Sequence, residues 1–410
     1  MRVCVVAEYY PRRRDPVLGV WAHRQALAAR AAGADVRVLA LERRIPPMAL
    51  VHAGARGRLG PLARWLGEVL AQPRHDRLDG VDVEYVRFVS PPRALSYADW
   101  ARYARGPVGR ALRRLDRSWG IELVHAHYAL PAGAAALAYA QAHDLPLAVS
   151  VHGGDVYGPA LMGARARARV AAVLARAAVV LCNSRITLER AAALGAGRER
   201  MDVVHLGAEA PLPAPAKHRQ PTVATLAHVV PRKRHADVAQ ALAALVRRGH
   251  DVHWAVIGHG PSLPALRELV ARLGLDGRVR WLGQLSPDQA LTELARSHAM
   301  AMPSLDEAFG VAYVEAMACG VPAIGCRGEG GPEEIAALGE GMLLVPLRDP
   351  EALADAIERA LADPDLTDAA TRTAAEHFSW ERCGADTVAA YERALSRVDD
   401  LGREHPATRA

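Results

Sequence analysis

The sequence predicts an α/β protein of two doubly wound, Rossmann-like domains that face a central cleft. Short, nearly continuous apolar runs alternate with segments of helical periodicity, which is typical of parallel sheets covered by helices on both faces. The alternation is interrupted once, at 208–221, where four prolines predict a stiff, extended connector. The length of 410 residues agrees with two domains, because one domain takes roughly 100 to 200 residues.

In the first domain, buried strands and the helices between them follow from the apolar pattern. Strands are expected at 3–7, 36–41, 83–89, 123–126, 147–151, 179–182 and 203–205, and helices at 21–32, 132–142 and 186–194.

The second domain repeats this alternation after the connector. Strands are expected at 223–226, 252–257, 279–282, 300–302, 323–326 and 342–345, and helices at 236–248, 262–273, 287–296, 311–318 and 350–361.

The resulting domain plan has five parts. A last helix lies beyond the final strand and is expected to return to the first domain. The boundaries are 1–207 for the first domain, 208–221 for the linker, 222–380 for the second domain, 381–398 for the returning helix and 399–410 for a flexible tail.

Charge is distributed unequally between the two halves of the chain. The 51 basic and 45 acidic residues give a formal charge of +6, but residues 1–216 carry +12 and residues 217–410 carry −6. The first half is therefore expected to meet an anionic partner, either a phosphate-bearing substrate or a membrane surface. Nucleic acid is not expected as a partner, because no helix-turn-helix, zinc-finger or aromatic-basic sheet signature accompanies the charge.

Cysteine usage and the N-terminus predict a cytoplasmic location. Five cysteines form no C-x-x-C pair, which favours a reducing compartment. The N-terminus lacks the pattern of a signal peptide, and no apolar run approaches the ~20 residues that span a bilayer. The basic, aromatic stretch at 99–120 fits peripheral contact with the anionic inner face of the plasma membrane, and it fits a solvated helix face equally well.

The most informative segment is 303–322. A loop with Glu307 follows a predicted strand, and a helix opens at about Gly310. The backbone N–H groups of Phe309, Gly310 and Val311 then lie at a helix N-terminus, where they can hold a phosphate. Glu315, one turn further, is expected to face the interior and to need a hydroxyl partner from a sugar or a ribose.

A basic turn at 226–235 precedes the helix expected at 236. Its side chains lie between a strand and a helix N-terminus, the position from which basic groups reach a diphosphate. Lys233 is one of only two lysines in the chain, the other being Lys217 in the linker. Taken alone, an Arg-Lys-Arg run is more often a solvated turn.

Glu307 and Glu315, with seven residues between them and Ala-Met-Ala-Cys-Gly-Val-Pro after them, resemble the E-x7-E signature of retaining family 4 glycosyltransferases of the GT-B fold. The resemblance covers most of the chain. It implies that Glu307 contacts the donor sugar, Glu315 the ribose and Lys233 the donor diphosphate. Family members usually have Gly-Arg where this chain has Ala227 and His228, so the second phosphate contact is expected from other groups. The two candidates are Arg234 and protonated His228.

The resemblance extends to the first domain. His152, in Val-His-Gly-Gly-Asp, is similar to the family histidine that lies over the donor sugar near the reacting carbon, so His152 and Glu307 are the expected catalytic residues. The segment His125-Ala-His127-Tyr resembles the acceptor side, and Asp155 is grouped with it.

Two glycine turns resemble donor-binding loops of the family. Gly19 corresponds to a loop that approaches the diphosphate, although the usual double glycine is absent, and Gly258 begins a Gly-His-Gly-Pro turn. Simple packing of a strand-helix turn explains a Gly-x-Gly equally well. No cofactor and no metal are expected, because the one Asp-x-Asp, at 363–365, lies far from the expected site.

These features predict a retaining glycosyltransferase that moves a sugar from a nucleotide diphosphate sugar to a hydroxyl of a lipid-linked or cell-envelope glycan. A UDP-sugar is favoured and a GDP-sugar is the alternative donor. Three other functions stay open: a transferase for small secondary metabolites, a GT-B nucleotide-sugar epimerase or hydrolase, and a non-catalytic protein that binds nucleotide sugars.

Overall fold

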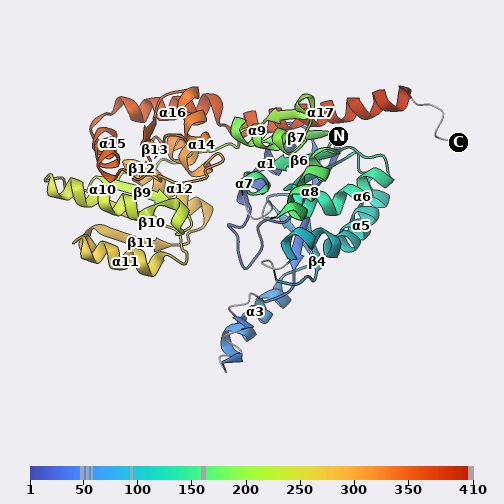
Figure 1. Cartoon of the computed structure of the whole chain (residues 1–410), viewed down its shortest axis with the longest axis horizontal. Coiled ribbons are helices and arrows are strands. Elements are labelled where there is room, and N and C mark those ends of the chain that lie inside the picture. Colours follow the sequence, from blue (N-terminus) through green and yellow to red (C-terminus); the bar gives the residue numbers. More distant parts are fainter. Residues whose placement is uncertain (47–49, 52–54, 57–58, 93–95, 158–162, 405–410) are drawn as a thin grey trace. The chain divides into compact units, whose positions relative to one another are not determined.

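The computed structural model describes residues 1–46, 50–51, 55–56, 59–92, 96–157 and 163–404. The chain forms two compact units (Figure 1). One consists of Met1–Val204 together with the chain from Cys383 onward, and the other of His205–Arg382.

The first unit contains an eight-stranded sheet in the order β3-β4-β2-β1-β5-β6-β7-β8. All neighbouring strands are parallel except β3 and β4. Strand β3 was not predicted, because its sequence His-Asp-Arg-Leu has no apolar run. The strands are β1 (Arg2–Ala7), β2 (Asp35–Arg43), β3 (His75–Leu78), β4 (Val81–Phe88), β5 (Leu123–His127), β6 (Leu147–Val151), β7 (Val179–Cys182) and β8 (Met201–Val203).

Helices pack against this sheet and bury its apolar side chains. The basic stretch at 99–120 forms a long helix, α5, whose apolar stripe contacts β4 and α6. Helix α3 was not predicted. The helices are α1 (Val20–Ala31), α3 (Leu59–Ala71), α5 (Trp100–Trp119), α6 (Ala134–Ala142), α7 (Gly154–Tyr157), α8 (Ala164–Leu174) and α9 (Arg185–Ala193).

The C-terminal helix α17 (Trp380–Glu404) packs on the first unit, as predicted (Figure 1). Gln25 of α1 donates to Thr387 at 3.0 Å. The Tyr391 hydroxyl lies 2.7 Å from His125 Nδ1. The helix continues to Glu404, further than the expected boundary at 398, because each added residue gains a backbone hydrogen bond once a helix is formed. The rest of the expected tail lies outside the described residues.

The second unit contains a six-stranded, entirely parallel sheet in the order β11-β10-β9-β12-β13-β14. The strands are β9 (Thr222–Leu226), β10 (His253–Ile257), β11 (Val279–Gly283), β12 (Ala299–Ala301), β13 (Ala323–Cys326) and β14 (Met342–Val345). The helices are α10 (His235–Arg247), α11 (Leu263–Arg272), α12 (Pro287–Arg296), α13 (Val311–Ala318), α14 (Gly330–Leu338), α15 (Pro350–Ala362) and α16 (Asp365–His377).

The proline-rich linker is held on the second unit. Ala208 N–H donates to Phe378 O, and His218 N–H donates to Arg296 O. Lys217 Nζ donates to Ser297 O at 2.7 Å.

The prediction of two doubly wound α/β domains is confirmed. Because the carboxyl ends of parallel strands lie at one edge of a sheet, the loops that follow the strands gather there in each unit. Within the described residues, no helix is both long enough and apolar enough to cross a membrane.

Candidate active site

A buried ion pair lies at the carboxyl edge of the second sheet. Lys233 ends the turn after β9, and Glu307 lies in the loop between β12 and α13. The ammonium of Lys233 donates to Glu307 Oε2, and both side chains are buried. Ser304 Oγ also donates to this oxygen, at 2.7 Å. Lys233 and Glu307, which were singled out from separate motifs, therefore form one ion pair.

The pair shifts the ionisation of both groups. Burial lowers the pKa of Lys233, and the charge of Glu307 only partly offsets this. Burial would raise the pKa of Glu307, but the charge and hydrogen bond of Lys233 outweigh it, so this pKa is lowered. Glu307 is consequently ionised at neutral pH, and it can oppose positive charge that develops on a sugar carbon.

The loop after Glu307 carries backbone donors at the N-terminus of α13. Among the described residues, no acceptor is found for the backbone N–H groups of Phe309, Gly310 and Val311. Gly310 has φ +87°, and a Cβ there would lie 2.4 Å from a ring carbon of Tyr313. Glycine is therefore required at this turn, which leads directly into the start of α13. Unsatisfied donors at a helix N-terminus favour a bound phosphate.

Arg232, not Arg234, is the arginine beside the ion pair. Arg234 has φ +55° and makes a two-point ion pair with Asp237, at 2.7 and 2.8 Å. Arg232 Nη1 lies 3.8 Å from Glu307 Oε2 and is half exposed. The left-handed turn at Arg234 directs its side chain onto its own helix. The sequence did not single out Arg232, since only the turn geometry tells the three basic residues apart.

Packing explains Gly258. A Cβ at Gly258 would lie 2.0 Å from Ala227 O, so the backbones after β9 and β10 approach too closely for another residue. A pocket of about 580 Å³ lies over this turn and includes His228, which is exposed. The pocket is lined by His228, His259, Gly260, Pro261, Leu263, Pro264 and Arg267.

Glu315 is partly exposed, so the expectation that it faces the interior is wrong. The buried stripe of α13 is formed by Tyr313, Val314, Ala316 and Met317. Glu315 lies on the flank of this stripe, where an incoming hydroxyl can reach it.

In the first unit, His127 and His152 stack at the ends of β5 and β6. His127 Nδ1 lies 2.9 Å from His152 Nε2, and the rings are nearly parallel. Burial lowers the pKa of His152 to about 3. Within the described part of the chain, the buried atoms His127 Nε2 and His152 Nδ1 have no hydrogen-bond partner. Neutral imidazoles with a free nitrogen can exchange hydrogen bonds with sugar hydroxyls.

His125 and Asp155 use their polar atoms inside the domain. His125 lies 2.8 Å from Ser150 Oγ and 2.7 Å from the Tyr391 hydroxyl, so both ring nitrogens are engaged. Asp155 accepts from the N–H groups of Ala129 and His152. Both side chains are buried, which leaves them no surface for an acceptor. Asp155 instead positions the backbone of His152.

Acid is expected to destabilise the protein through His125. Burial, and then the charge of His152, lowers its pKa from 6.5 to about 3. Below pH 6.5, His125 therefore binds a proton in the unfolded chain but stays neutral in the folded chain. The free energy of unfolding consequently falls as pH decreases from 6.5 towards 3. Each pH unit in this range costs about 1.4 kcal/mol for one histidine. Urea unfolding from pH 7 to pH 5 should show a shallower decline for His125→Gln than for wild type. An equally steep decline would contradict the assignment.

Gly19 is held by packing at the start of α1. Its φ is +66°, and a Cβ would lie 2.2 Å from the carbonyl carbon of Tyr9. Gly19→Ala is expected to destabilise the protein by about 2–4 kcal/mol, since strain and a backbone clash combine. Gly33→Ala is the matched control: φ is +100°, but nothing lies within 4 Å of the added Cβ. Equal losses of melting temperature in the two variants would rule out the clash.

A second pocket lies at the carboxyl ends of β1, β2 and β4, and none of its residues was predicted to bind donor or acceptor. It encloses about 390 Å³ and combines three arginines with aromatic side chains. Within the described residues, buried Arg12 Nε and Arg14 Nη1 have no hydrogen-bond partner. The lining is Glu8, Tyr9, Arg12, Arg14, Asp15, Leu18, Leu41, Arg43, Ile45, Trp65, Phe88 and Trp100. These lining residues do not form a sequence motif. Only the position of several of them at strand ends could have marked them as candidate site residues.

Across the described ranges, no group of three or more His, Cys, Asp and Glu side chains is arranged to hold a metal ion.

Two family models match the chain. The family described as Glycosyltransferase Family 4 matches residues 18–210, and the family described as Glycosyl transferases group 1 matches residues 212–377.

Curated relatives cover less of the chain. An MMP alpha-(1->4)-mannosyltransferase of Mycolicibacterium hassiacum is 33% identical over 206 residues, 49% of this chain and 50% of the relative. A D-inositol 3-phosphate glycosyltransferase of Corynebacterium urealyticum is 34% identical over 180 residues, 41% of this chain and 42% of the relative. The chain thus spans about half the length of the curated relatives it matches.

Solved structures share the whole fold. A sucrose-phosphate synthase of Thermosynechococcus elongatus has a TM-score of 0.72 at 20% identity, covering 97% of this chain and 100% of that one. HepE of Anabaena, solved with UDP and glucose, has a TM-score of 0.69 at 17% identity, covering 96% and 99%. These likenesses show the fold, and the two family matches, which together run from residue 18 to residue 377, show that the chain belongs to the family 4 glycosyltransferases.

Proposed function

We propose that the protein transfers a sugar from a nucleotide diphosphate sugar to a hydroxyl acceptor with retention of anomeric configuration. The observation that carries this proposal is the buried Lys233–Glu307 pair beside three backbone donors without acceptors. A cation and a row of amides suit a diphosphate, and a carboxylate a few atoms away suits the sugar attached to it.

The second unit would hold the donor. The amides of Phe309, Gly310 and Val311, with Lys233 and Arg232, stabilise the negative charge of the leaving diphosphate. The bond from the anomeric carbon to the diphosphate oxygen breaks, and the bond to the acceptor oxygen forms on the same face of the sugar. The acceptor proton passes to the departing diphosphate. Glu307 stabilises the positive charge on the ring, and this scheme does not require a metal.

We propose that the exposed edge of α13 contacts the nucleoside and that a residue of the first unit contacts the donor sugar. Glu315 would accept from the ribose hydroxyls, and His152 from a hydroxyl of the donor sugar. The pocket over Gly258 leaves room for the base. UDP is the proposed nucleotide, supported by the UDP bound to HepE, and GDP is the alternative, supported by relatives whose names state GDP-mannose dependence.

The proposed acceptor is phosphate-bearing, either lipid-linked or part of an envelope glycan. The unpartnered guanidinium nitrogens of Arg12 and Arg14 suit an anion, and the aromatic rings around them suit a sugar or an inositol ring. Two relatives have names that state inositol phosphate and phosphatidylinositol acceptors. A lipid-linked acceptor would bring the protein to the inner face of the plasma membrane.

A two-part experiment tests the function. Thermal shifts with UDP, GDP and ADP should show stabilisation by one nucleotide, expected to be UDP. The corresponding tritiated nucleotide sugar is then incubated with inositol phosphate and with lipid extract, and the anomeric configuration of the product is determined by NMR. Labelled product with the donor's configuration supports the proposal. Free sugar released equally with and without acceptor would identify a hydrolase, and an inverted product would refute retention.

A further inference from the structure

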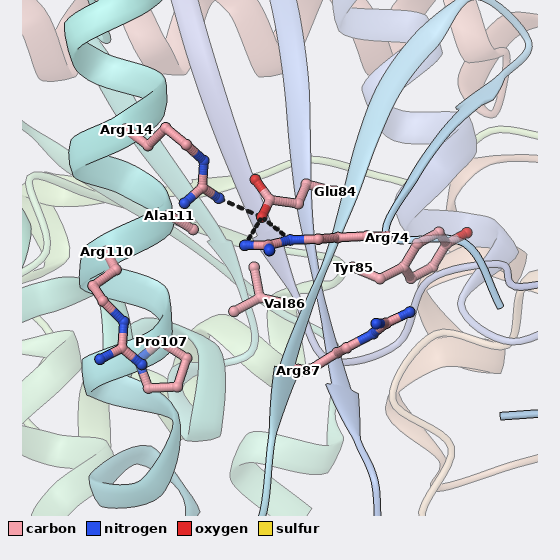
Figure 2. A pocket seen from close by; sticks show the side chains of 9 residues that line it. All are labelled: Arg74, Glu84, Tyr85, Val86, Arg87, Pro107, Arg110, Ala111 and Arg114. Carbon is pink, nitrogen blue, oxygen red and sulfur yellow. Dashed lines mark hydrogen bonds and ion pairs between the residues drawn. The ribbon is translucent and has the colours of Figure 1, made fainter. Parts of the chain in front are cut away.

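A pocket on the first unit lies away from both sites described above. It sits between β4 and α5 and encloses about 350 Å³. Its strand residues, 84–87, precede the carboxyl end of β4, and its helix residues begin at Pro107, about two turns after Trp100. The pocket is lined by Arg74, Glu84, Tyr85, Val86, Arg87, Pro107, Arg110, Ala111 and Arg114, which Figure 2 shows.

The pocket holds four arginines and one acid. Figure 2 shows Arg74 and Arg114 reaching the same carboxylate, that of Glu84. The contacts from Arg74 are long, 3.4 Å each, and its side chain is 58% exposed. Two guanidinium groups therefore share one counter-charge, and one of them is held loosely.

The other two arginines differ in their partners. Arg87 is committed to the buried carboxylate of Glu42, at 3.2 Å, and to Gln72 O, at 2.8 Å. Arg110 is exposed, and within the described residues it has no hydrogen-bond or ion-pair partner. It projects from α5 one turn before Arg114, on the same side of the helix (Figure 2). The pocket thus offers donors that the protein itself does not use.

Like charges gathered in this way repel one another, and an anion would relieve the repulsion. Arginine forks match the oxygens of a phosphate with two parallel hydrogen bonds, which makes phosphate the best fit to this chemistry. The volume exceeds that of a bare phosphate, and Val86, Pro107 and Ala111 add an apolar wall. A phosphate that carries an organic group would contact both the arginines and the apolar wall.

We propose that this pocket binds a phosphomonoester or a diphosphate ester, separately from donor and acceptor. Arg110, Arg114 and Arg74 hold the phosphate oxygens. Without the ligand, Glu84 reduces the repulsion between Arg74 and Arg114 by pairing with both. The phosphate belongs either to a soluble ester or to a lipid headgroup at a membrane surface, and the chemistry of recognition is the same.

Calorimetric titration of the full chain with sodium pyrophosphate tests the site. Saturating UDP is present, so that any donor site is already filled, and ionic strength is matched with sodium chloride. Wild type should bind pyrophosphate, and Arg110→Gln should bind it about tenfold more weakly, as expected for one lost charge-assisted contact. Arg105→Gln is the matched control, since Arg105 is exposed on the same helix but does not line the pocket.

Two further measurements keep the result interpretable. Melting temperatures without pyrophosphate should be equal for Arg110→Gln and wild type, because Arg110 makes no hydrogen bond or ion pair with the residues that the structure describes. Sedimentation with phosphatidylcholine vesicles, with and without phosphatidic acid, distinguishes the sources. Binding to the phosphatidic acid vesicles that Arg110→Gln weakens identifies a lipid headgroup, and an effect on pyrophosphate alone identifies a soluble ester. Equal binding by Arg110→Gln and Arg105→Gln in both assays overturns the proposal.

Discussion

Lys233→Met is expected to lower the free energy of unfolding by about 3–5 kcal/mol and to abolish binding of nucleotide diphosphates. Both effects have one origin. Methionine fills the space of the lysine stem but leaves the Glu307 carboxylate buried without its counter-charge, which is the costly way to break a buried pair. It also removes the point charge proposed for the donor diphosphate. Urea unfolding measures the first effect and UDP calorimetry the second.

The chain offers a matched control for this variant in its other lysine. Lys217 is exposed, in contrast to Lys233, and its ammonium donates to Ser297 O rather than to a carboxylate. Lys217→Met should cost less stability and leave UDP affinity unchanged. The double variant Lys233→Met/Glu307→Gln should regain most of the lost stability while UDP binding stays absent. Undiminished UDP affinity in Lys233→Met would remove this residue from the donor site.

Glu307→Gln is expected to reduce transfer by about 10²–10³-fold while UDP still binds. The amide keeps the size of the side chain and can still accept from Ser304. It loses the negative charge that the proposed mechanism requires opposite the developing positive charge on the sugar, and electrostatic groups of this kind are worth about 3–4 kcal/mol in the transition state. Initial rates with saturating donor measure the loss in kcat.

Glu293→Gln separates this effect from general loss of a buried carboxylate. Glu293 is also buried in the second unit, where it pairs with His218 and Arg280. Its replacement should lower the melting temperature and spare the rate per folded molecule. If Glu307→Gln turned over at the rate of Glu293→Gln, Glu307 would have no part in the reaction.

Prediction from the sequence succeeded where the signal is local. The apolar strands are each a single run of three to nine residues, and a run of this kind can be recognised without knowing its neighbours. The polar strand β3 was not predicted because it has no local apolar signal and becomes a strand only by pairing with β4. Glycine turns were partly accessible: Gly310 was placed correctly at a helix start, but the role of Gly258 in close packing depends on Ala227 O from another loop.

Site residues divide in a similar way. Residues 303–322 and Lys233 stand in compact motifs, so their candidacy could be seen in the sequence. The direction in which each side chain points could not be predicted from the sequence. Arg234 turns onto Asp237 because its backbone is left-handed, and Arg232 takes the place beside Glu307. His125 was expected near an acceptor, yet α17 covers it with Tyr391 from 266 residues along the chain.

By itself, therefore, the sequence determined the two α/β domains, the resemblance to family 4 glycosyltransferases and the identity of the lysine and glutamates with chemistry to offer. Only the tertiary structure decided that Lys233 and Glu307 form one buried pair, that Asp155 holds the backbone of His152, and that arginines from three segments line a separate pocket. The physical reason is range. Periodicity and turn chemistry act over a few residues, whereas burial, charge pairing and the shape of a pocket arise where distant segments meet.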